Sequence, residues 1–192
     1  MIYFNGFSQR EVSLHIHQPL LPWHLSDSVV VDLWKYYLCH LSCNRESAHE
    51  CILIMADTVV QLNCYDEPNT QLTLQIGIDS SQQAHPNYTG DLNPIHNMYW
   101  TWQSGYIQLK AEGKILRDNG IWEDFQWHLG GYRYYPTDRK IQHLITANAI
   151  DFVWDEKLLA QILQLNPTQQ IMSESKEASE LMTRITQCIT FR

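Results

Sequence analysis

Nine histidines in a chain of 192 residues are the side chains best suited to chemistry, and two of them are separated by a single residue. His15 and His17 lie in the alternating run 11–17, where a strand would place both imidazoles on one face with Cα atoms about 7 Å apart. Such a pair can bind copper or zinc. Two exposed strand histidines without a ligand would give the same pattern, so both interpretations stay open.

Three further histidines lie in or near aromatic segments. His85 and His96 fall in the polar stretch 79–97, and His128 lies inside the block 125–132, Phe-Gln-Trp-His-Leu-Gly-Gly-Tyr. A histidine flanked by apolar residues is commonly a hydrogen-bonded core residue, so this block alone leaves His128 either structural or a ligand. Few carboxylates lie near these histidines in the sequence, and an imidazole site would therefore favour copper or zinc over Mg²⁺ or Ca²⁺.

Segment 98–106, Met-Tyr-Trp-Thr-Trp-Gln-Ser-Gly-Tyr, is unusually rich in aromatic residues. Side chains two apart on a strand share a face, so Trp100 and Trp102 would form one flat aromatic pair, with Tyr99 and Thr101 facing the other way. The pair could line a metal site. It could also stack on a sugar ring, and a metal-free carbohydrate or small-ligand binding module is therefore the alternative to metal binding.

The rest of the sequence excludes several classes of function. There is no Gly-x-Ser-x-Gly elbow, His-Glu-x-x-His motif, phosphate-binding loop or Rossmann glycine pattern, so we expect a binding protein rather than an enzyme. A formal net charge of -8 argues against a nucleic-acid partner. No apolar run is long enough to span a membrane. Residues 1–7 do not form an intact signal peptide, so the chain is either cytosolic or begins after a removed signal.

Strand-like runs fill the first two thirds of the chain and helical patterns fill its end. Runs rich in β-branched and aromatic residues, or with strict alternation, are typical of strands; they are 11–17, 28–41, 51–55, 58–62, 70–78, 105–113, 125–129 and 140–146. Two amphipathic segments, 155–163 and 173–185, predict short helices, the second with Ser173 as a candidate N-cap. We therefore expect a mainly β fold, an antiparallel β-sandwich-like single domain over 1–192. It would be β-rich over 1–153 and helical over 154–192.

Cysteine usage leaves the redox state open. The chain has five cysteines, an odd number, so at least one is unpaired within the chain if the others form disulfides. Their spacing does not match a common four-ligand zinc site. The sequence is consistent with one or more disulfides and also with none.

Several segments, taken in order, resemble the MbnP-like family of copper-binding proteins. We call three of them the signature segments: 76–80 (Ile-Gly-Ile-Asp-Ser), 98–107 (the aromatic segment and Ile107) and 125–132. The resemblance also includes 90–94 (Gly-Asp-Leu-Asn-Pro), the pair Glu112-Gly113, and a C-terminal part with Ile171-Met-Ser, Glu177-Ala178 and Phe191. It covers nearly the whole chain.

The resemblance implies a periplasmic or secreted protein that binds copper, as Cu(I) or Cu(II), and acts in copper acquisition or handling without catalytic turnover. In characterised members an oxidised tryptophan, kynurenine, joins histidines at the copper site, and the partner is a di-haem, cytochrome c peroxidase-like enzyme of the MbnH type. His128 matches a family histidine, and Trp100 and Trp102 match the motif tryptophans. His85 lies near the position of a loop histidine, with Ala84 in place of an Asn. His96 is the third candidate ligand.

Overall fold

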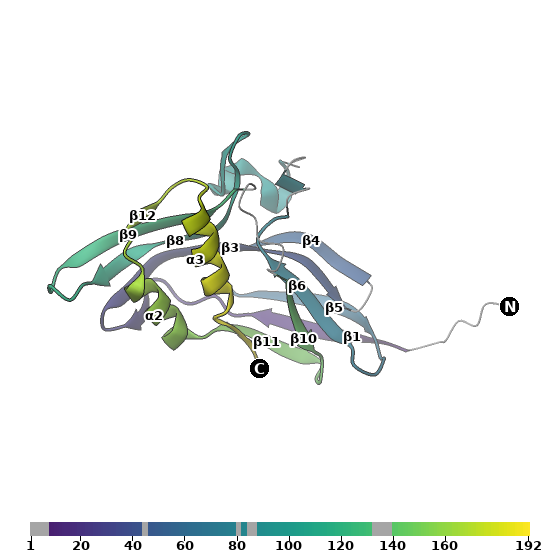
Figure 1. Cartoon of the computed structure of the whole chain (residues 1–192). Coiled ribbons are helices and arrows are strands. Elements are labelled where there is room, and N and C mark those ends of the chain that lie inside the picture. Colours follow the sequence, from purple (N-terminus) through teal and green to yellow (C-terminus); the bar gives the residue numbers. More distant parts are fainter. Residues whose placement is uncertain (1–7, 44–45, 80–81, 84–87, 132–139) are drawn as a thin grey trace.

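The part of the chain that the structure describes is built mainly from two β-sheets and two α-helices (Figure 1). The computed structural model describes residues 8–43, 46–79, 82–83, 88–131 and 140–192, without the side chains of 46–50. The smaller sheet, sheet A, has the order β13-β11-β1-β5. Its strands are β1 (Gln9–Ile16), β5 (Thr58–Tyr65), β11 (Ala149–Trp154) and β13 (Ile189–Phe191).

The larger sheet, sheet B, has the order β10-β6-β3-β8-β9-β12, and β2 and β4 also pair with β3 while β7 pairs with β8. Its strands are β2 (Trp23–Ser26), β3 (Val29–Cys43), β4 (Glu46–Ile54), β6 (Gln71–Ile76), β7 (Tyr99–Thr101), β8 (Gly105–Leu116), β9 (Trp122–Gly130), β10 (Lys140–Leu144) and β12 (Gln170–Ile171). Most pairs are antiparallel, but β1 pairs in parallel with β11 and β9 with β12. The predicted mainly β, sandwich-like fold is confirmed, with sheets that are mixed rather than purely antiparallel.

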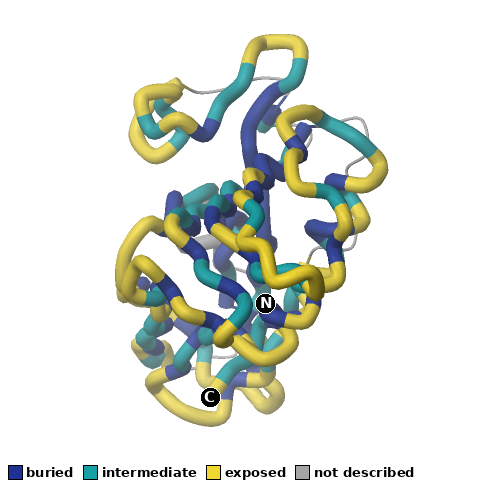
Figure 2. Tube along the Cα trace, turned by 90° about the vertical axis from the view of Figure 1, so that its left-hand side faces the viewer, coloured by how far each residue is buried: buried dark blue, intermediate teal, exposed yellow. Residues whose placement is uncertain are grey.

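One main core fills the space between the inward faces of the sheets and the helices. On β1 the apolar residues alternate as predicted, and Val12, Leu14 and Ile16 are fully buried while the residues between them face outward. Figure 2 shows the same division over the described residues, with buried residues inside and many exposed residues on the loops. The alternation therefore sets which face of sheet A is left to solvent.

The middle of β3 is buried on both of its faces. Tyr36 and Leu38 point into the main core, whereas Tyr37 and Cys39 point the other way into a separate apolar cluster, which we call the second core. Its buried members are Tyr37, Cys39, Leu53, Ile78, Met98, Tyr106 and Ile107. Four of these residues lie within the signature segments 76–80 and 98–107: Ile78, Met98, Tyr106 and Ile107. These two segments therefore supply much of the second core, on the outer side of sheet B.

Helices α2 (Glu156–Leu165) and α3 (Lys176–Thr186) confirm the two predicted helical segments. Asp155 caps α2 by accepting a hydrogen bond from the Leu158 amide. The cap of α3 is Ser175, whose side chain accepts from the Ala178 amide, and not Ser173 as predicted. Segment 154–192 is also not purely helical, because it contributes β12 to sheet B and β13 to sheet A. No helix within the described residues is long and apolar enough to cross a membrane.

Two disulfides account for four of the five cysteines. Cys39–Cys51 joins the adjacent strands β3 and β4, and Cys43–Cys64 joins β3 of sheet B to β5 of sheet A. Cys188 is free and buried, and burial raises the pKa of its thiol to about 12. The open question of cysteine pairing is thus answered by one link within sheet B and one link between the sheets.

Candidate metal centre

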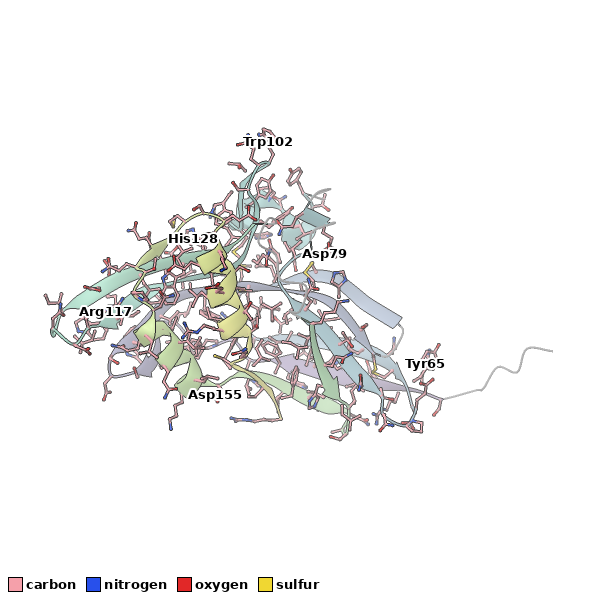
Figure 3. The ribbon with its side chains drawn as sticks, in the orientation of Figure 1. Tyr65, Asp79, Trp102, Arg117, His128 and Asp155 are labelled. Carbon is pink, nitrogen blue, oxygen red and sulfur yellow. A yellow bond between two sulfur atoms is a disulfide. The ribbon has the colours of Figure 1, made fainter. Side chains whose placement is uncertain are left out.

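His128 lies on β9 with its side chain on the outer face of sheet B, whereas its neighbours Trp127 and Leu129 point into the main core. Its Nε2 atom is 2.8 Å from Oε1 of Glu112, and the same oxygen is 3.4 Å from Nζ of Lys110. Glu112 and Lys110 come from β8, where Lys110 is the direct cross-strand partner of His128. The His128 side chain is only 9% exposed and is largely shielded from water, whereas Glu112 is 29% exposed. Figure 3 shows the place of His128 in the fold.

The electrostatics of the cluster keep the imidazole of His128 neutral. Burial lowers its pKa, and this effect, with the charge of Lys110, outweighs the opposing hydrogen bond to Glu112. Burial alone would raise the pKa of Glu112, but the hydrogen bond from His128 and the contact with Lys110 lower it overall. A neutral imidazole facing an ionised carboxylate must carry its proton on Nε2. The lone pair therefore lies on Nδ1, which is the nitrogen that can bind a metal.

The other two candidate ligands are placed differently. His96 ends a short 3-10 helix, η2 (Pro94–His96), and its Nε2 is 3.2 Å from the carbonyl oxygen of Gly90. Since a carbonyl only accepts, Nε2 donates this bond and Nδ1 again carries the lone pair. His85 lies outside the described residues. Within the part of the chain that is described, no three His, Cys, Asp or Glu side chains form a group that could hold a metal ion.

Trp100 and Trp102 do not form the flat pair that strand periodicity predicted. Strand β7 ends at Thr101, so Trp102 lies in the turn that follows and is 78% exposed at the tip of the hairpin (Figure 3). Trp100 is half-buried and packs against the second core, with its indole nitrogen shielded from solvent. The prediction failed because the chain turns after Thr101 and the two-residue alternation stops there. The alternative of a carbohydrate-binding module required a flat aromatic surface, which Trp100 and Trp102 do not form.

Asp79 of the first signature segment joins β3 to the loop that follows β6. Its Oδ2 is 2.6 Å from Nε2 of His40, and its Oδ1 accepts a hydrogen bond from the Gln82 amide. His40 has a φ of 53°, a left-handed conformation that residues other than glycine rarely adopt, and the pairing of β3 with β6 shifts register around it. The strained backbone turns the imidazole of His40 toward Asp79, and such strain is concentrated at functional positions.

Gln83 ties this loop to the other two signature segments. Its Oε1 accepts from the Tyr106 amide, and its Nε2 donates to the carbonyl of Gly131, which also accepts from Gln108. Gly130 lies directly behind this point, where a Cβ would collide with the backbone carbonyl of Tyr106. All three signature segments thus meet around one buried glutamine.

His15 lies on the outer face of β1 in sheet A, as the sequence predicted, whereas His17 directly follows the end of that strand. His15 is the parallel cross-strand partner of Asp151 on β11, and Nε2 of His17 is 2.7 Å from Oδ1 of Asp151. The hydrogen bond with His17 lowers the pKa of Asp151, and this effect, with the nearby charge of Arg192, outweighs the opposing effect of burial. The pair therefore faces a carboxylate that the sequence spacing did not reveal.

The family model that matches this chain is that of MbnP, and it covers residues 14–174. The chain belongs to the MbnP family. Among solved structures, MbnP from Methylosinus trichosporium has the same fold, with a TM-score of 0.52 at 10% identity over 88% of this chain and 82% of that chain. At this identity the likeness shows the fold alone. No curated protein sequence matches the chain.

Within the MbnP fold, sequence reasoning found the histidines but missed their carboxylate partners. Glu112 was part of the resemblance, yet nothing assigned it to His128, and the contact of His40 with Asp79 was not anticipated. The available signal was alternation: Lys110 and Glu112 share one face of β8, so a carboxylate two residues from a lysine on a strand could have been matched to an outward histidine on the next strand.

Replacing Gln83 with Leu should lower the free energy of unfolding by about 2 kcal/mol, because the buried amide of Tyr106 loses this acceptor and the carbonyl of Gly131 loses one donor. Urea denaturation measures the change. Gln161→Leu, at an exposed position on α2, is the matched control and should change stability by less than about 0.5 kcal/mol. Equal effects of the two substitutions would show that Gln83 does not join the signature segments.

Proposed function

We propose that this member of the MbnP family is an extracytoplasmic copper-binding protein that acts in copper acquisition or handling and has no catalytic turnover. One observation carries the proposal: the shielded, neutral imidazole of His128 is held by the carboxylate of Glu112. A histidine that donates one ring N–H to a carboxylate is the usual arrangement of a metal ligand, because the second nitrogen is then fixed in orientation and made more basic.

The donor chemistry fits copper. Copper, as Cu(I) or Cu(II), accepts imidazole nitrogen, and a Cu(I) site needs only two or three soft ligands in a low-coordinate arrangement. His128 supplies the first ligand, and His96 and His85 are the candidates for the others. Lys110 lies beside Glu112 and offsets the charge of its carboxylate. The positive charge of Lys110 would repel a divalent ion more strongly than the monovalent Cu(I).

The disulfides support an extracytoplasmic location. Structural disulfides persist in the periplasm and outside cells and are rare in the cytosol. Cys39–Cys51 and Cys43–Cys64 lie in the second core and between the sheets, where they are part of the packed structure. A periplasmic or secreted protein would keep both links.

The proposal includes oxidation of one motif tryptophan to kynurenine with a di-haem, peroxidase-like partner enzyme. Trp102 is the exposed member and is accessible to a partner, whereas Trp100 packs against the second core. Peptide mass spectrometry of protein produced with and without such an enzyme tests this. A mass change on the peptide containing Trp100 and Trp102 supports it, and an unchanged peptide in both preparations contradicts this part of the proposal.

The central test is His128→Ala. Competition with a chromogenic Cu(I) chelator should show a loss of Cu(I) affinity of at least about 10-fold, since removal of even a supporting carboxylate weakens metal sites by about 10- to 100-fold. Glu112→Gln, which keeps the side-chain volume, should show the smaller loss within that range. His24→Ala on the exposed face of β2 is the matched control and should bind like the parent. Unchanged affinity in His128→Ala would place copper elsewhere.

A further inference from the structure

We propose a second, solvent-exposed metal site on the outer face of sheet A, formed by His15, His17 and Asp151, that binds a divalent transition-metal ion, with Cu²⁺ preferred over Zn²⁺. It does not depend on the His128 site. In Figure 3 Asp155, which lines a cavity beside the proposed site, lies well below His128. His17 lines that same cavity.

The strand register brings the three side chains together. His15 is an outward residue of β1, since Leu14 and Ile16 on either side of it are buried, and the exposed His17 directly follows the end of the strand. Asp151 is the outward cross-strand partner of His15 on the parallel strand β11. Neighbouring strands are about 4.8 Å apart, and residues two apart on a strand are separated by about 7 Å, so the three Cα atoms form a triangle that side chains can close over one ion.

Two of the three donors already touch. Nε2 of His17 and Oδ1 of Asp151 are 2.7 Å apart, so an ion seated between them would replace this hydrogen bond with two ligand bonds. In the present conformation, no three His, Cys, Asp or Glu side chains of the described residues form a metal-binding group. Metal binding therefore requires the side chain of His15 to turn toward His17 and Asp151. Both His17 and Asp151 are about half exposed, and this rearrangement can occur without moving the core.

The surroundings leave room for further ligands. His17 lies at the edge of a cavity of about 670 Å³ whose charged lining residues are Asp155, Glu156 and Arg192. Two imidazoles and one carboxylate fill three positions around the ion, and water or a small molecule in the cavity can fill the rest. The two carboxylates attract a cation and Arg192 opposes it, so the nearby charge favours the ion by a small net amount.

The donor set selects the class of ion. Imidazole suits copper, zinc, iron and nickel, and the carboxylate excludes a purely soft site that would hold only Cu(I). Affinity for such a set rises along the divalent series to Cu²⁺ and falls at Zn²⁺. As an isolated exposed ion pair, His17–Asp151 would contribute little to stability. A metal-binding role therefore predicts variants with normal stability and altered metal affinity.

Isothermal titration of the full-length protein with Cu²⁺, together with electron paramagnetic resonance, tests the site. His15→Ala, His17→Ala and Asp151→Asn should each weaken one Cu²⁺ site by at least about 10-fold, and the histidine variants should lose a nitrogen from its spectrum. Zn²⁺ should compete for the same site with lower affinity. His24→Ala is the control. Thermal unfolding without metal should be unchanged in all four variants.

Two results would overturn the proposal. One is Cu²⁺ binding that is the same in the three variants and the parent, and the other is loss of all Cu²⁺ binding in His128→Ala, which would leave no second site. The measurement is separate from that for the proposed function. His128→Ala should keep this Cu²⁺ site, and His17→Ala should keep the Cu(I) affinity of the parent.

Discussion

Replacing Trp127 with Ala should lower the free energy of unfolding by about 4 kcal/mol, one of the largest effects expected from a single substitution in this chain. The indole is fully buried in the main core, with its ring 4.7 Å from that of Phe125 between centroids. Its Nε1 also donates to the carbonyl of Thr168, which holds the segment before β12 against β9. The substitution leaves both a cavity and an unpaired carbonyl, and urea denaturation measures the combined loss.

Trp122 offers a matched control on the same strand. It is the first residue of β9 and nearly half exposed, so Trp122→Ala should change stability by less than about 0.5 kcal/mol. Trp127→Phe keeps most of the apolar volume and loses the hydrogen bond, and it should fall between the two, at about 1.5 kcal/mol. A Trp127→Ala loss no larger than that of Trp122→Ala would show that β9 is not packed as described.

Removing the disulfide between the sheets, in Cys43→Ala/Cys64→Ala, should lower the free energy of unfolding by about 3 kcal/mol. The two residues are 21 apart in sequence, and the link restricts the unfolded chain while joining β3 of sheet B to β5 of sheet A. Chemical denaturation of the variant and the parent under non-reducing conditions measures the difference.

The second disulfide supplies the comparison. Cys39 and Cys51 are 12 residues apart, so their disulfide closes a shorter loop, and its removal in Cys39→Ala/Cys51→Ala should cost slightly less stability. Both variants keep one disulfide and the free Cys188, which makes the pair directly comparable. A loss below about 1 kcal/mol in Cys43→Ala/Cys64→Ala would contradict the role of this link in fastening the sheets together.

Local patterns predicted the long strands and both helices because these elements carry their own periodicity. The alternating run 70–78 contains β6, and the apolar run 28–41 lies almost entirely within β3. Strands that depend on distant partners were missed. β11 is adjacent to a helix and pairs with β1, and β12 and β13 are short, so their formation depends on tertiary contacts rather than on sequence pattern.

The residues of the candidate sites were also predicted only where the local sequence pattern indicated them. The sequence indicated His128, His15 and His17 by residue type and by alternation. It did not reveal Asp151 as a partner, and alternation could suggest Glu112 for His128 only if their strands were assumed to be neighbours, because cross-strand contacts depend on register and strand order. The copper site with His85, His96 and His128 stays a prediction.

The pairing of β1 with β11 also affects how the chain can fold during synthesis. His17 and Asp151 are 134 residues apart, so β1 has only β5 beside it until most of the chain has been made. Its other edge then presents unpaired backbone groups to any strand nearby, a known route to aggregation. We expect slow folding, as is usual when distant segments must meet.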